Sequence, residues 1–166
     1  MRRLTWLFGL ILVPALLLTA HNATASASPT TDPKDGPLRV YGERSWQMQL
    51  GISYWNELAG RTVIRYAGLS MPATAAGDPH TVAVKVAALP DNLAGLTAGN
   101  VGQTALTVTI DPGYVSQWVV YAHEFGHTLG FDHDNGPGYT GVMSYASMWQ
   151  DLDPAGDRKL ILGQAH

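Results

Sequence analysis

Three histidines and one glutamate lie within a single short segment, at spacings that fit a catalytic metal site. The segment reads His123-Glu124-Phe125-Gly126-His127-Thr128-Leu129-Gly130-Phe131-Asp132-His133, and it holds half of the six histidines in the chain. On a helix, His123 and His127 share one face because they lie four residues apart. Glu124 is rotated from His123 by about 100°, so its carboxylate can flank a metal held by the two imidazoles.

A third imidazole can reach the same metal if the chain reverses direction after the helix. Gly130 can adopt the left-handed conformation that ends a helix, and the reversal brings His133 in from another side. Three neutral nitrogen ligands leave the fourth position of a tetrahedral zinc open for water, which is the catalytic arrangement rather than the structural one. If the three histidines had only a structural role, three polar rings would be buried close together, and their burial would cost free energy. The segment therefore predicts a zinc hydrolase, with His123, His127 and His133 as ligands and Glu124 as general base.

The first residues have the features of an export signal. Arg2-Arg3 precedes an apolar run from Leu4 to Leu18, and small residues follow. This order is typical of a secretory signal peptide over residues 1–27, and the run is shorter than the roughly 20 residues of a membrane span. An uncleaved N-terminal anchor is the alternative. Cleavage after Ala25 or Ala27 would leave about 140 residues, a normal size for one exported domain.

Composition narrows the classes of partner. Residues 28–37 are rich in Ser, Thr, Pro and Asp and predict a flexible leader, and no further break appears over 38–166, the expected catalytic domain. The chain has no cysteine, which excludes cysteine hydrolases and thiolate zinc fingers. The formal net charge is −3 and Lys and Arg do not cluster, so nucleic acid is not an expected partner. We expect a secreted, extracellular monomer that leaves the membrane once the signal is cleaved.

Residue patterns then predict the elements that position the histidines. Strands are predicted at Leu38–Tyr41, Thr62–Tyr66, Thr81–Ala87 and Ala105–Ile110. Helices are predicted from an N-cap at Ser45 to Gly60, from about Tyr114 to Leu129, and within Asp153–Leu162. The glycine-rich stretch Leu89–Gln103 predicts a long irregular loop, and Gly126 within the second helix predicts close packing. Together they predict an α+β fold, a twisted mixed sheet of about four to five strands backed by two main helices, with a zinc cleft and a C-terminal helix.

The zinc motif is followed by Val142-Met143-Ser144-Tyr145, and this pair of motifs resembles the metzincin clan of metallopeptidases. The resemblance implies a small, secreted, matrixin-like or snapalysin-like bacterial member. It implies that Met143 lies beneath the metal as a hydrophobic base, and that Tyr145 reaches the metal or the oxyanion. The residues do not agree on one subfamily. Asp134 after the third histidine is similar to the pattern of snake-venom members, and Tyr145 is similar to the tyrosine of astacins and serralysins. Snapalysins carry Asp where this chain has His133.

The function expected from motif and resemblance is a secreted zinc-dependent endopeptidase that hydrolyses protein or peptide substrates with a zinc-bound water activated by Glu124. The resemblance implies a substrate extended beside an edge strand, either Ala105–Ile110 or the loop beside it. Asp134 has two open readings, as a residue that orients a ligand imidazole or as a solvated turn residue. A catalytically inactive zinc-binding module and a non-peptide zinc amidohydrolase are the alternative functions.

Calcium is a further candidate cofactor, beside the one catalytic zinc. Asp78, Asp91, Asn92 and Asp111 fall in predicted loops and offer the oxygen ligands that Ca²⁺ prefers. No EF-hand loop or glycine–aspartate repeat accompanies them. The sequence therefore gives calcium much weaker support than zinc.

Overall fold

A five-stranded mixed sheet and three α-helices make up the part of the chain that the computed structural model describes, residues 36–90, 93–134, 139–144 and 152–163. The strands are β1 Leu38–Tyr41, β2 Ile64–Gly68, β3 Thr81–Val86, β4 Gly95–Ala98 and β5 Leu106–Ile110. The helices are α1 Trp46–Ala59, α2 Trp118–Thr128 and α3 Pro154–Gly163, with short 3₁₀ turns η1 Ala73–Ala75 and η2 Pro112–Tyr114. This mixture of a sheet with separate helices is compatible with the predicted α+β class.

The strand order is β2-β1-β3-β5-β4. All pairs are parallel except β4 with β5, which run antiparallel with Gly95 opposite Ile110 and Ala98 opposite Thr107. The prediction of an irregular loop over Leu89–Gln103 is therefore wrong for its middle, because β4 lies there. The tertiary pairing with β5 overrides a local composition that disfavours a strand. Since β5 lies between β3 and β4, the expectation of Ala105–Ile110 as an edge strand is wrong, and among the described strands the edge on this side of the sheet belongs to β4.

Helix α1 has the predicted ends. The Ser45 hydroxyl accepts a hydrogen bond from the Met48 backbone N–H at 3.0 Å, and Gly60 closes the helix with a φ of 65°. Its inward face buries Met48 and Trp55 completely. The side chain of Trp55 also donates to the Ala122 carbonyl of α2 at 2.7 Å, so the two helices are joined by a polar contact within an apolar interface.

Helix α2 begins later than predicted. The predicted start at about Tyr114 falls in η2, where the Asp111 carboxylate accepts from the Gly113 N–H at 2.8 Å, and the α-helix starts only at Trp118. Proline lacks the N–H that would continue a strand ladder and suits the first position of a helical turn. The sequence Asp111-Pro112 therefore produces a short separate turn, and α2 carries only the segment around the histidines.

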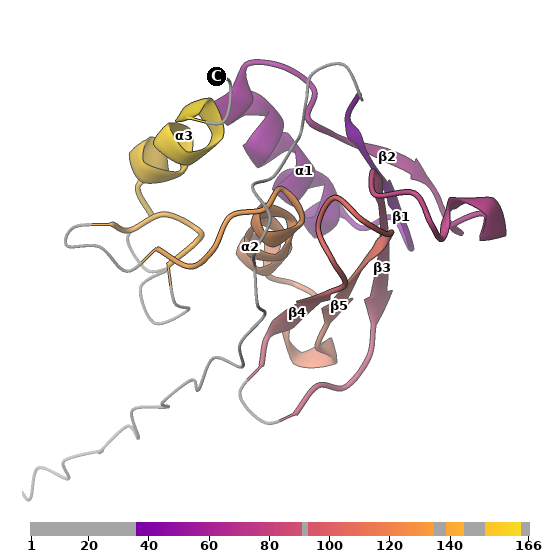
Figure 1. The fold of residues 1–166 in the computed structure, drawn as a ribbon. Helices are drawn as coiled ribbons and strands as arrows, with labels where there is room; N and C mark the ends of the chain where they lie inside the picture. The colour runs from indigo at the N-terminus through magenta and orange to yellow at the C-terminus, as the bar shows by residue number, and fades with distance from the viewer. Residues whose placement is uncertain (1–35, 91–92, 135–138, 145–151, 164–166) are drawn as a thin grey trace, which may run out of the picture.

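The helices are arranged in layers on one side of the sheet (Figure 1). Helices α1 and α2 pack against each other and against the strands, α1 on β2 and α2 on β4 and β5, while α3 packs on α1 away from the sheet. The largest fully buried side chains come from both layers, including Trp55, Phe125 and Ile110. In the described part of the chain, no helix is both long and apolar enough to cross a membrane. Helix α2 is thus held between α1 and the β4–β5 edge of the sheet.

The contact of α1 with α2 leads to a first prediction, on Gly51. A Cβ atom at this position would lie 2.9 Å from the backbone nitrogen of Ala122. We expect Gly51→Ala to lower the free energy of unfolding by about 1–3 kcal/mol through overpacking, although alanine is the better helix former. Thermal and urea unfolding would measure the change. The matched control is Gly163→Ala in α3, where no atom lies within 4 Å of the added Cβ; equal stabilities of the two variants would contradict the prediction.

Candidate metal centre

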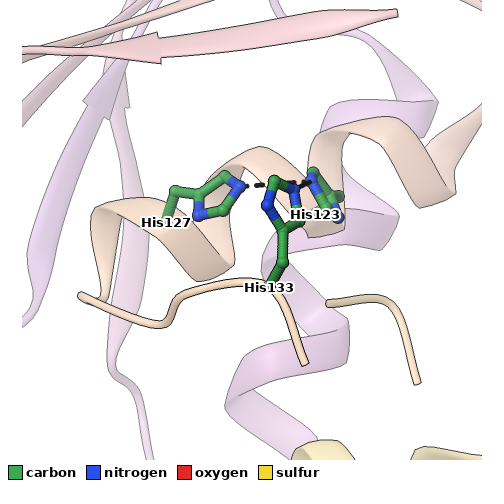
Figure 2. Close-up of side chains that lie close together, drawn as sticks. All are labelled: His123, His127 and His133. Carbon is green, nitrogen blue, oxygen red and sulfur yellow. Dashed lines mark hydrogen bonds between the residues drawn. The ribbon is translucent and has the colours of Figure 1, made fainter. Parts of the chain in front are cut away.

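The three histidines of the motif converge through one ring nitrogen each. His123 and His127 project from the same side of α2, and His133 approaches from the segment that follows the helix (Figure 2). The Nε2 atom of His123 lies 3.0 Å from Nε2 of His133 and 3.2 Å from Nε2 of His127. A tetrahedral zinc with Zn–N bonds of about 2.0–2.1 Å separates its nitrogen ligands by roughly 3.3 Å. The spacing of the three nitrogens is therefore close to that of a metal site.

The opposite nitrogens of two of these rings are held by backbone carbonyls. Nδ1 of His123 lies 2.6 Å from the carbonyl oxygen of Val142, and Nδ1 of His127 lies 2.8 Å from that of Phe131. A carbonyl oxygen only accepts, so each Nδ1 carries the proton and donates it. In the neutral rings the two Nε2 atoms then hold lone pairs and cannot hydrogen-bond to each other. A cation bound between them would remove this repulsion, so the three histidines could hold a metal ion.

The electrostatics of the site also favour neutral imidazoles. Burial lowers the pKa of His123 to about 3, with further lowering by His127. Burial is also the main cause that lowers the pKa values of His127 and His133, while the charge of Asp132 opposes it at both rings. Metal ligation requires the neutral ring. The site therefore keeps its donor atoms in the binding form near neutral pH.

The turn after α2 is the one that brings His133 to the site. Gly130 has a φ of 88°, as predicted from its place in the motif. The Gly130 N–H donates to the carbonyl of His127 and the Phe131 N–H to that of Gly126, both at 3.0 Å, which is the hydrogen-bond pattern of a Schellman helix end. The same turn leaves the Phe131 carbonyl facing His127. The turn at Gly130 thus ends the helix, orients His127 through the Phe131 carbonyl and brings His133 to the cluster.

Met143 lies directly against the motif helix. Its side chain is fully buried, and a Cβ atom added to Gly126 would collide with the Met143 sulfur and lie 2.8 Å from a ring carbon of Trp55. The prediction of close packing at Gly126 is therefore confirmed. The Asp134 backbone N–H donates to the Met143 carbonyl at 3.0 Å, which joins the segment of the third histidine to the methionine. A role of the Asp134 side chain in orienting an imidazole stays a prediction.

Asp157 of α3 supports His123 through the backbone of Val142. Its fully buried carboxylate accepts hydrogen bonds from the hydroxyls of Tyr54 and Tyr139, and from the Val142 N–H at 2.7 Å. Burial and the Asp157 charge raise the pKa values of both phenols above the usual range. Because the carbonyl of Val142 accepts from His123, α3 and α1 together hold the residue whose carbonyl orients a candidate ligand.

Glu124 is directed at strand β4. Its side chain is buried, and the Thr97 hydroxyl lies 2.7 Å from Oε2 and 3.1 Å from the backbone carbonyl of Glu124. Burial raises the pKa of Glu124 to about 7, and the hydrogen bond from Thr97 opposes that rise. A cation held by the adjacent imidazoles would also favour the charged carboxylate. Burial therefore acts on the pKa of Glu124 in the opposite direction to Thr97 and to a bound cation.

The structure does not describe all of the predicted site residues. Tyr145 lies outside the described residues, and so do Asp91 and Asn92. Of the other calcium candidates, Asp78 pairs with Arg39 and accepts from the His80 N–H, while Asp111 accepts from Leu89 and Gly113. Within the residues that the structure describes, the three histidines are the only such group of His, Asp or Glu close enough to share a metal ion. Asp78 and Asp111 do not come together.

Sequence reasoning missed Thr97 and Asp157. Thr97 lies in the stretch predicted to be irregular, where the only signal is a short alternation, with Leu96 and Ala98 exposed on one face of β4 and Gly95 and Thr97 turned to the other. Asp157 is one of several acidic residues near the C-terminus, and its complete burial depends on partners far away in the sequence. Neither contact has a local spacing that would predict it.

The comparisons with known proteins gave no match: no family model, no curated protein and no solved structure is similar to this chain at a significant level. The site therefore rests on the residues and their geometry.

The hydrogen bonds of Asp157 lead to a second prediction. Asp157→Asn replaces one acceptor oxygen by an N–H₂ group that faces a donor, so we expect the free energy of unfolding to fall by about 2–4 kcal/mol. Looser orientation of His123 should also weaken Zn²⁺ binding by about tenfold, as measured by titration against a competing chelator. Asp153→Asn is the control, because the Asp153 carboxylate accepts only an exposed contact from the Ala155 N–H. Zinc affinity equal to that of the wild type would show that Val142 does not need Asp157.

Proposed function

We propose that the chain is a secreted zinc-dependent endopeptidase of the metzincin type. The observation that carries this proposal is the convergence of three neutral imidazole nitrogens beside a buried glutamate from the same helix. A site for metal alone would need the histidines only. Glu124 adds a group that can move a proton, and the three-nitrogen set is the number of protein ligands that catalytic zinc sites use.

The residues divide the work of peptide hydrolysis. His123, His127 and His133 would hold the metal, and zinc when bound supplies a Lewis acid that activates water and polarises the scissile carbonyl. Glu124 accepts a proton from the attacking water and returns it to the leaving amine, so one residue serves as base and then as acid. Val142 and Phe131 keep the ligand rings in the tautomer that presents Nε2. The proposed role of Tyr145 at the oxyanion comes from the resemblance alone.

The metzincin assignment is supported by the surroundings of the histidines. Met143, placed by the resemblance beneath the metal, packs on Gly126 of the motif helix. The mixed sheet with two main helices and a C-terminal helix agrees with the fold that the resemblance implies. Strand β4 offers a free, antiparallel edge next to α2, to which an extended peptide could add as a further strand. A protein or peptide substrate fits this edge better than a small amide does.

A third prediction tests the metal. His127→Ala removes one of three ligands, so purified His127→Ala protein should lose its bound zinc while the wild type retains one ion per chain. Metal analysis after gel filtration would measure the content. His80→Ala is the control, because His80 lies outside the histidine cluster. Full zinc occupancy in His127→Ala would place the metal elsewhere.

A fourth prediction tests the reaction. The wild type should digest casein, and a chelator should stop it. Glu124→Ala should keep zinc and the fold, yet lower kcat by about 10²–10⁴-fold, because it removes the proton carrier but no ligand. A zinc-loaded wild type that leaves casein intact would point to a binding module, whereas chelator-sensitive hydrolysis of small amides alone would point to an amidohydrolase.

A further inference from the structure

We propose, on the basis of the peptidase function proposed above, that Thr97 is a positioning residue that fixes the carboxylate of Glu124 through strand β4. The general base lies on α2, but one of its carboxylate oxygens is bound by a different element. The Thr97 hydroxyl lies 2.7 Å from Oε2 of Glu124, within the range of a hydrogen bond to a carboxylate. The partner is 27 residues away in the sequence, so the contact is made by the fold.

Gly95, two residues earlier on the same face of β4, supplies the space that the carboxylate needs. A Cβ atom at this position would lie 2.6 Å from Oε1 and 2.7 Å from Cγ of Glu124. The side chain of Glu124 therefore passes directly over the Gly95 backbone. Gly95 allows the approach and Thr97 binds the end of the side chain, so both positions of this face serve the same carboxylate.

A hydroxyl suits this position because it can both donate and accept. It can donate to Oε2 when the carboxylate is charged, and it can accept from that oxygen when the carboxyl group carries a proton. The Thr97 oxygen also lies 3.1 Å from the backbone carbonyl of Glu124, a second acceptor for its single hydrogen. Thr97 thus offers a partner to Glu124 at each stage of a reaction in which that residue gains and then loses a proton.

The alternative is that Thr97 only attaches β4 to α2. In that case its loss would affect folding or metal binding, and any drop in kcat would follow the loss of folded, zinc-loaded protein. A positioning role instead lowers kcat in fully folded and loaded protein, because the carboxylate samples other directions. The two cases are separated by measuring stability, metal content and kinetics on the same variants.

The test replaces the hydroxyl without changing the shape. Thr97→Val, Thr97→Ser and the wild type are purified with zinc and compared on one peptide substrate. We expect Thr97→Val to lower kcat by about 10–100-fold with KM within about twofold, at unchanged zinc content, and Thr97→Ser to restore most of the rate. Thr107→Val makes the same chemical change on β5 opposite Ala98 and should leave kcat unchanged. A crystal structure of Thr97→Val should show the Glu124 carboxylate displaced from β4.

Three results would overturn the proposal. Thr97→Val with the kcat of the wild type would show that the hydroxyl does not matter, and a Glu124 carboxylate that stays in place in its crystal structure would show that another group holds it. If Thr97→Val fails to fold, a low kcat in well-folded, zinc-loaded Thr97→Ser would equally count against it. An inactive wild type would instead remove the peptidase function itself, which separates the two failures.

Discussion

The rest of the structure depends on the positions of two imidazole rings whose nitrogen lone pairs face each other. Two backbone carbonyls accept hydrogen bonds from the Nδ1–H groups of His123 and His127, and the Nε2 atoms of the two rings face each other 3.2 Å apart. Such an arrangement is unfavourable in the absence of a cation, and it persists only where the surrounding structure fixes each ring. The carbonyl of Phe131 is fixed by the glycine turn at the end of α2, and that of Val142 by the buried carboxylate of α3. A metal that bound here would therefore lose little binding free energy to the ordering of flexible side chains.

Each layer of the fold contributes one part of that fixation. Helix α1 carries Trp55 and Tyr54, of which the first bonds to α2 and the second to Asp157. The backbone of α2 at Ala122 packs closely on Gly51 of α1, and Met143 packs against Gly126 of α2. The sheet acts from the other side through β4, which meets Glu124. The imidazoles are thus held from the helical side and the Glu124 carboxylate from the sheet side, so the two groups depend on different contacts.

Whether a feature can be predicted from the sequence depends on how far apart in the chain the interacting residues lie. The clustering of the three histidines, the glycine turn at Gly130 and the cap at Ser45 were predictable, because each is set by residues within a few positions of one another. Strand β4 was not, since a short glycine-containing segment becomes a strand only by pairing with β5. The late start of α2 has a local cause, because Asp111-Pro112 forms the separate turn η2 before the helix begins at Trp118. Thr97 and Asp157 act across 27 and 15 residues, and no local pattern encodes those distances.

The two faces of strand β4 have different surroundings: one lies against Glu124 and the other is exposed. Of its inward positions, Gly95 has no room for a side chain because Glu124 lies against it, and Thr97 binds the Glu124 carboxylate through its hydroxyl. Leu96 and Ala98 point outward, and Leu96 is 42% exposed. Within the described part of the chain, its outer edge is not paired with another strand. A peptide added at that edge would meet the outward side chains and the backbone, and the inward ones would hold the base at a fixed height relative to it. Because successive side chains of a strand face opposite sides of the sheet, the side chains at positions 96 and 98 can change without displacing the Glu124 carboxylate.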